Sequence, residues 1–128
     1  MKKILLLHIA FSFSTVLMTQ KPLMKNQNAV QQTVFKMFDA LSNRDSVSLK
    51  AYCTADITLY EYGQVWNIDT LILKAIALNQ SADFKRTNSF DFINTTADKN
   101  TAWVTYRLQS VITRDGKQAT VQWLETVV

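Results

Sequence analysis

Arg107 and Glu125 are the charged residues whose positions first suggest a binding site. Each falls in a stretch rich in β-branched and aromatic residues, TAWVTYRLQSVIT and QATVQWLETVV, which predicts a strand. The intervening RDGK predicts a hairpin turn at Asp115-Gly116, so the two strands should pair. We expect Arg107 and Glu125 to share a face and form an ion pair. At a pocket mouth that pair would orient an acidic ligand; elsewhere it would only satisfy its own charges.

Tryptophans supply the aromatic surface that could accompany these charges. In TAWVTYRLQS, alternation places Trp103, Thr105 and Arg107 on one face of the strand. Such a mixture of aromatic and polar groups suits the wall of a ligand cavity better than a dry core. Aromatic residues on strands also commonly belong to the core, and that alternative stays open. The predicted ligand-binding residues are Arg107, Glu125, Trp103, Trp123 and Trp66.

Several kinds of chemistry find no support in the sequence. The single histidine, His8, lies in a predicted leader, and Cys53 is the single cysteine. Once the leader and His8 are removed, no Ser-His-Asp, Cys-His or metal-ligand grouping can be assembled from the remaining residues. The sequence also has no phosphate-binding loop. We therefore expect no metal and no cofactor, and we interpret Cys53 as a small buried apolar residue.

The composition is that of one globular domain. The chain has 128 residues, of which 48% are hydrophobic and 19% charged. Removing Lys2 and Lys3 with the leader reduces the 14 basic residues to 12, against 10 acidic ones, for a charge of about +2. The basic residues are scattered rather than clustered in a stripe, so no nucleic-acid partner is expected.

The N-terminus has the pattern of a secretory signal peptide. Lys2 and Lys3 precede an apolar run from Ile4 to Met18, which is short for a membrane span. We predict a signal peptide over residues 1–20 and a secreted or periplasmic protein. The alternative is an uncleaved leader that anchors the chain, which would be its only contact with a membrane.

The rest of the chain predicts helices followed by long strands. Helical spacing of apolar residues indicates a helix over 26–43, a short one capped by Asp45 or Ser46, and a third over 67–80. A strand over 55–63 returns through Gly63 into 64–66. Strands follow over 83–94, 101–113 and 118–128. This order predicts an α+β fold with helices packed on one face of a curved antiparallel sheet.

With these elements in place, the segments YEYGQVW, AWVTYRL and WLETVV give the chain a family resemblance from Val30 to its end. It resembles the nuclear transport factor 2-like superfamily, and within it the SnoaL-like and ketosteroid-isomerase-like small secreted proteins. The resemblance implies a cone-shaped sheet wrapped around the N-terminal helices, a cystatin-like α+β roll with a pocket, and a homodimer through the outer sheet face. In this family another strand follows, so residues 21–128 are expected to be one C-terminally truncated domain, or one completed by a partner.

The resemblance also implies a catalytic position at Glu61, where ketosteroid-isomerase relatives carry a carboxylate that moves a proton next to a carbonyl. The first helix carries Phe35 and Phe38 where those enzymes have a tyrosine that stabilises the oxyanion. We therefore expect first an exported domain that binds an acidic or apolar small molecule, without demonstrated catalysis. The alternatives are an isomerase or cyclase that uses Glu61 as general base, and a dimerisation module.

Overall fold

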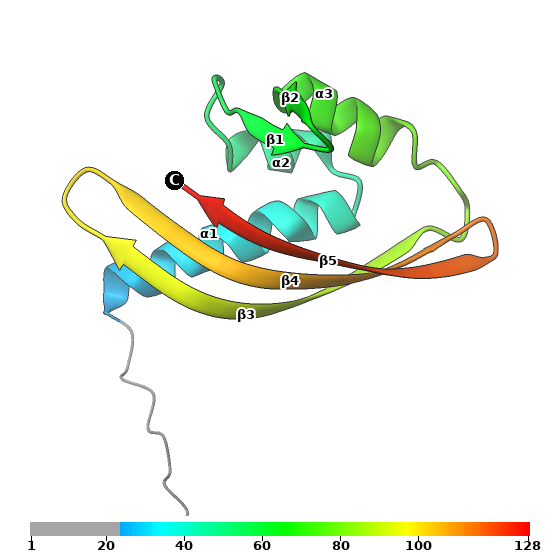
Figure 1. The fold of residues 1–128 in the computed structure, drawn as a ribbon. Coiled ribbons are helices and arrows are strands. Elements are labelled where there is room, and N and C mark those ends of the chain that lie inside the picture. The colour runs from blue at the N-terminus through cyan, green and yellow to red at the C-terminus, as the bar shows by residue number, and fades with distance from the viewer. Residues whose placement is uncertain (1–23) are drawn as a thin grey trace, which may run out of the picture.

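The computed structural model describes residues 24–128, and it has helices followed by an antiparallel sheet, as the sequence predicts. Two short helices and a hairpin follow the long first helix, and three long strands complete the chain (Figure 1). The elements are α1 (Lys25–Ser42), α2 (Ser46–Ala51), β1 (Leu59–Glu61), β2 (Gln64–Trp66), α3 (Ile68–Ile72), η1 (Leu73–Ala77), β3 (Lys85–Ala97), β4 (Ala102–Arg114) and β5 (Lys117–Val127). The α+β class is confirmed.

The strands form two separate sheets. The order β3-β4-β5 makes the large sheet, and β1 and β2 pair only with each other. The large sheet curves beneath α1, while α2, α3 and the β1-β2 hairpin lie on the far side of that helix (Figure 1). The third predicted helix, over 67–80, is α3 continued by the π-helical turn η1, so its helical part ends at Ala77.

The core forms between α1 and the inner face of the large sheet. Val34, Phe38 and Leu41 from α1 meet Tyr106 and Leu108 of β4, and all five side chains are buried. The Phe38 ring lies edge-on to Tyr106, with ring centroids 6.2 Å apart. Such pairs add a directional preference to apolar burial, so they fix how α1 sits on the sheet.

Short-range signals set the turns and caps. Asp45 caps α2 by accepting hydrogen bonds from the backbone N–H groups of Val47 and Ser48, as predicted. Asp115 and Gly116 have φ values of 53° and 68°, and they form the two-residue loop between β4 and β5. Positive φ at both loop positions matches the twist of the flanking strands, so this turn fixes the register of the hairpin.

The inner face of β4 is the opposite of the one predicted. Val104, Tyr106, Leu108 and Ser110 are buried, whereas Trp103 is 38% exposed on the outer face. In antiparallel sheets, residues directly opposite each other share a face, and Phe90 of β3 lies opposite Leu108. The face of β4 that packs on α1 is therefore the one that lies beside Phe90 of β3 and Trp123 of β5.

The predicted signal peptide over residues 1–20 lies outside the described residues. Within residues 24–128, no helix has the length and apolar character needed to cross a membrane.

We predict that Leu49→Ala destabilises the protein by about 3 kcal/mol, because Leu49 has no exposed surface and its truncation leaves a cavity. The matched control is Val47→Ala on the same helix. Val47 is 80% exposed, so its truncation should change the free energy of unfolding by less than about 0.5 kcal/mol. Urea denaturation followed by tryptophan fluorescence measures both, and equal losses would contradict the packing of α2.

Candidate functional site

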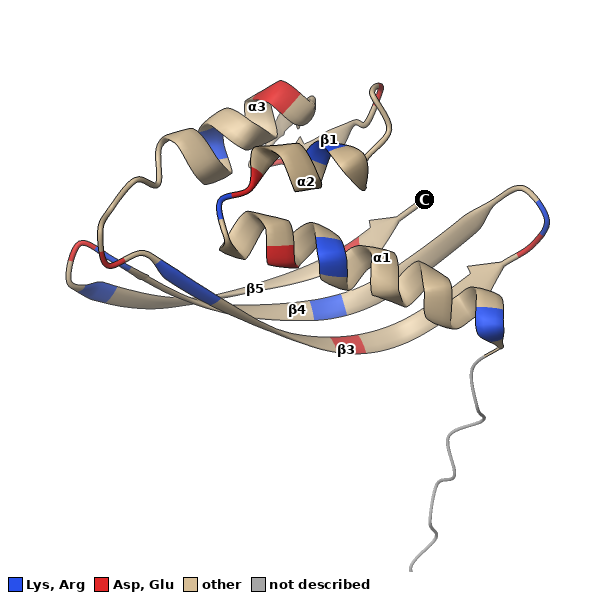
Figure 2. Cartoon of the chain, turned by 180° about the vertical axis from the view of Figure 1, so that it is seen from behind, with Lys and Arg blue, Asp and Glu red and all other residues tan. Residues whose placement is uncertain are grey.

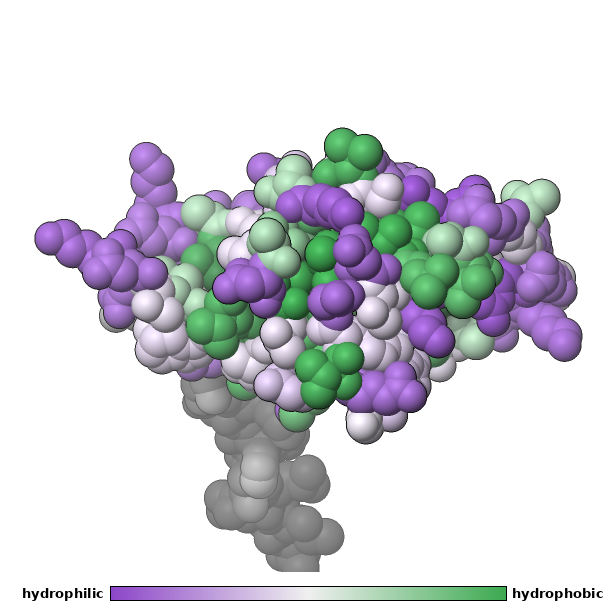
Figure 3. Space-filling view, turned by 90° about the horizontal axis from the view of Figure 1, so that it is seen from above, coloured by the Kyte–Doolittle hydropathy of each residue, from purple (hydrophilic) through white to green (hydrophobic). Residues whose placement is uncertain are grey.

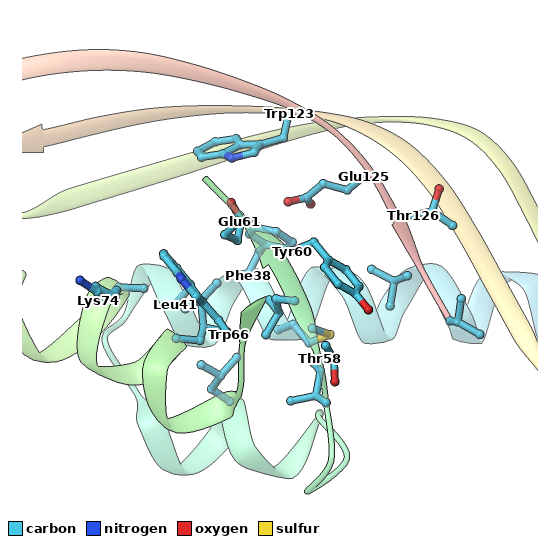
Figure 4. Close-up of a pocket in the computed structure, with 18 of the residues that line it drawn as sticks. Phe38, Leu41, Thr58, Tyr60, Glu61, Trp66, Lys74, Trp123, Glu125 and Thr126 are labelled. Atoms are coloured by element: carbon cyan, nitrogen blue, oxygen red, sulfur yellow. The ribbon is translucent and has the colours of Figure 1, made fainter. Parts of the chain in front are cut away.

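A cavity of about 750 Å³ lies between the inner face of the large sheet, α1 and the β1-β2 hairpin. Apolar and aromatic side chains form most of its wall (Figure 4), and the charged residues that line it are Asp56, Glu61, Lys74, Arg86 and Glu125. A volume of this size and a largely apolar lining are typical of sites for small molecules. The apolar and aromatic lining includes Phe38, Leu41, Leu59, Trp66, Leu71 and Trp123.

Two carboxyl groups face each other across this cavity. Glu61 projects from the end of β1 and Glu125 from β5, and their carboxyl groups point toward one another beneath Trp123 (Figure 4). Glu61 therefore comes from the small sheet and Glu125 from the large one. The site depends on how the two sheets are placed around α1, not on any single element.

Burial dominates the electrostatics of Glu125. Its Oε2 atom is buried and has no hydrogen-bond partner among the described residues. Removal from water raises the pKa of Glu125, as does the negative charge of Glu61, while the Tyr106 hydroxyl and the positive charge of Arg86 act in the opposite direction. The net shift is upward, so this carboxyl group keeps its proton to a higher pH than an exposed glutamate.

Tyr106 stands beside Glu125, directly opposite it on the neighbouring strand. Burial raises the pKa of the Tyr106 hydroxyl, and the nearby carboxylate of Glu125 raises it further. The phenol therefore stays protonated and can donate a hydrogen bond to the neighbouring carboxylate of Glu125.

Arg86 of β3 supplies a fixed positive charge at the inner end of the cavity. Its Nε–H donates to Oδ1 of Asn88 at 3.0 Å, and its Nη2–H donates to Oγ of Ser110 at 3.1 Å. Its guanidinium group lies 5.3 Å from the ring centroid of Phe38 and 5.6 Å from that of Trp123. Burial lowers the pKa of Arg86, and its attraction to Glu125 opposes that effect.

A polar chain ties Arg86 to the first helix. The Ser110 hydroxyl donates to Oδ1 of Asn88, whose Nδ2–H donates to Oγ of Ser42. The Ser42 hydroxyl in turn donates to the backbone carbonyl of Phe38. Because each member is bonded, the guanidinium group is held in one orientation.

Four of the predicted site residues line this cavity and two do not. Glu61, Trp66, Trp123 and Glu125 contribute to its wall. Arg107 instead lies on the outer face of the sheet, two-thirds exposed, and forms an ion pair with Asp91 at 3.0 Å. Trp103 shares that outer face.

The expectation that Arg107 and Glu125 form an ion pair on one face is therefore wrong. The two-residue loop at 115–116 sets Arg107 opposite Leu124 and Glu125 opposite Tyr106, and neighbouring positions on a strand point to opposite faces. The same register shows that Tyr106, which no sequence argument singled out, belongs to the site. Arg86 carried no comparable signal, because it is one of a scattered set of basic residues.

Comparisons with protein-family models, with curated proteins and with solved structures found no match to this chain. Among the described residues, no group of His, Cys, Asp and Glu is arranged to hold a metal ion. Lys and Arg are dispersed over the described elements rather than gathered in one stripe (Figure 2). Cys53 is only partly buried, beside the core, and burial raises the pKa of its thiol.

We predict that Glu125→Gln stabilises the protein relative to the wild type as the pH rises. A carboxyl group with a raised pKa binds more protons in the folded state than in the unfolded one. Its contribution to stability therefore falls as the pH increases from the ordinary value of 4.5 through the folded-state pKa. Melting temperatures at pH 5 and pH 8 measure the effect. The melting temperature of the variant relative to that of the wild type should be higher at pH 8 than at pH 5.

The control for this measurement is Asp39→Asn, which neutralises an exposed carboxyl group on α1 outside the cavity lining. A difference between wild type and Glu125→Gln that shrinks or reverses toward pH 8 would contradict the burial of Glu125.

Proposed function

We propose that this protein is an exported domain that binds a small molecule in the cavity between the large sheet and the β1-β2 hairpin. The observation that carries the proposal is a largely apolar cavity of about 750 Å³ in which the carboxyl groups of Glu61 and Glu125 face each other. Apolar walls provide affinity through burial, and a few polar groups at one place fix the orientation of the ligand. The ligand accordingly has an apolar body and a polar group near Glu61 and Glu125.

The cavity mouth supports the same proposal. Seen from the side of α3 and the hairpin, apolar side chains reach the surface between polar ones (Figure 3). In the hairpin Tyr60 and Tyr62 are 82% and 80% exposed, and both border the cavity. Aromatic rings at an opening offer contact area to a ligand at a small cost in conformational entropy.

Binding of the neutral dye Nile red tests this proposal. The wild type should bind the dye with a blue shift of its emission, and Leu71→Trp should weaken binding at least about tenfold, because the larger side chain fills the cavity that Leu71 lines. The matched control is Leu78→Trp, which adds the same ring at a position that is 64% exposed and outside the lining. Circular dichroism confirms that each variant folds.

Equal dye affinity in the wild type and in folded Leu71→Trp would overturn the assignment of the cavity as the binding site. Loss of binding in the Leu78→Trp control as well would show that the dye reports on surface hydrophobicity instead.

An enzyme that transfers protons is the second candidate, supported by the raised pKa of Glu125 beside a second carboxyl group. In this role Glu61 would act as general base on a carbon next to a carbonyl, and the carbonyl oxygen would face Tyr106 and protonated Glu125.

We predict in that case that the protein accelerates deuterium uptake into α-tetralone in deuterium oxide. Glu61→Gln should reduce the rate at least about a hundredfold, and Asp91→Asn on the outer face should not. An unchanged rate in Glu61→Gln would refute the role of Glu61.

The resemblance to the nuclear transport factor 2-like superfamily and the homodimer that it implies stay predictions. What supports the predicted interface is the outer face of the large sheet, where Ile93, Trp103 and Leu124 are 48%, 38% and 69% exposed. Exposed apolar groups of this kind are typical of a surface that meets a partner, although they are interspersed here with the Asp91–Arg107 pair.

A further inference from the structure

We propose that the ligand of this cavity is an organic cation, an apolar or aromatic molecule with a protonated amine that Glu61 and Glu125 hold between them. This inference rests on the proposed binding function and names its ligand class. It replaces the acidic ligand expected from Arg107, since that guanidinium group is on the outer face.

The first argument comes from hydrogen-bonding capacity. Donors at the inner end of the cavity are partly engaged: Nε–H of Arg86 donates to Asn88, its Nη2–H donates to Ser110, and the Tyr106 hydroxyl stands next to Glu125. At the hairpin, the indole Nε1–H of Trp66 donates to Oε1 of Gln64 at 3.2 Å. The one buried side-chain polar atom without a partner among the described residues is an acceptor, Oε2 of Glu125, and an ammonium group brings three donors and no acceptor.

The second argument comes from the carboxyl groups themselves. In the described part of the chain neither Glu61 nor Glu125 forms a salt bridge, and Oε2 of Glu125 lacks any donor. Two carboxyl groups that face each other in an apolar cavity repel when both are ionised. A cation between them removes that repulsion and completes their hydrogen bonds.

The third argument is the balance of charge and aromatic surface around the cavity. Its charged lining residues are Asp56, Glu61 and Glu125 against Lys74 and Arg86, which is an excess of one negative charge when Glu125 is ionised. Lys74 is exposed on η1, and Arg86 is fixed within the sheet. The rings of Trp66 and Trp123 lie on either side of the carboxyl groups (Figure 4), where their faces can attract a cation.

Three probes of similar size and different charge test the inference: phenylbutylamine, phenylbutanol and phenylbutanoate, measured by isothermal titration calorimetry. The amine should bind at least tenfold more tightly than the alcohol, and the carboxylate most weakly. Glu61→Gln/Glu125→Gln should remove the preference for the amine while the alcohol still binds. Asp91→Asn, which removes a carboxyl group from the outer face, should leave all three affinities unchanged.

The pH dependence provides a second readout. The charged and titratable groups around Glu125 are Glu61 on β1, Lys74 on η1, Arg86 on β3 and Tyr106 on β4. Because the amine needs Glu125 ionised, its affinity should rise between pH 5 and pH 8, and binding should release a proton, seen as heats that depend on the buffer. An acceptor ligand such as a ketone would need Glu125 protonated and would show the opposite trend.

The possible outcomes separate the inference from the function on which it rests. If the alcohol binds as tightly as the amine, or the carboxylate binds most tightly, the cationic ligand is refuted while a binding cavity remains. If neither the amine nor the alcohol binds, both the ligand class and the proposed function fail.

Discussion

The burial of Glu125 is the constraint on which the site depends. Pairing with Tyr106 across two neighbouring strands places this carboxyl group on the inner face of the large sheet, where one of its oxygens finds no donor. Burying a polar group without a hydrogen bond costs stability, so the surrounding structure must offset that cost. It does so through the aromatic contacts between α1 and the sheet, and through the nearby positive charge of Arg86.

The polar chain behind Arg86 explains why the positive charge does not simply neutralise the cavity. Asn88 and Ser110 accept hydrogen bonds from the guanidinium group, and Asn88 connects it to Ser42 at the end of α1. With its Nε–H and Nη2–H groups donating within the sheet, and with the rings of Phe38 and Trp123 beside it, Arg86 is held in place as a counter-charge. The positive charge lowers the pKa of Glu125 without forming a salt bridge with it, so both carboxyl groups of the cavity stay available to a ligand.

Much of the fold could be predicted from the sequence, because its signals are local. The helical spacing of α1, the cap at Asp45 and the Asp115-Gly116 turn each depend on a few adjacent residues, and each is confirmed.

The inner face of β4 was mispredicted, because both faces carry large apolar groups and the strand alone does not decide between them. The decision comes from Phe90 and Trp123, which lie opposite Leu108 on the two flanking strands. Counting pairs outward from the turn would have placed Tyr106 beside Glu125 and separated Arg107 from it. The partners of Arg86 come from α1, β3 and β4, so no pattern within one segment could have revealed its role.

The separation of the two sheets explains why a cavity exists here rather than a filled core. β1 and β2 pair only with each other, so the hairpin that carries Glu61 and Trp66 is not hydrogen-bonded to the large sheet that carries Glu125. A two-stranded hairpin has little stability of its own and depends on what it packs against.

Beside the hairpin, α3 passes into the π-helical turn η1, which brings Lys74 and Ala75 to the cavity wall. Irregular turns of this kind are often found at functional sites. One wall of the site is therefore the three-stranded sheet, and the other is a set of short elements whose strands do not pair with it. A ligand that bridges Glu61 and Glu125 would join the two walls, so binding and local stability should be coupled at this cavity.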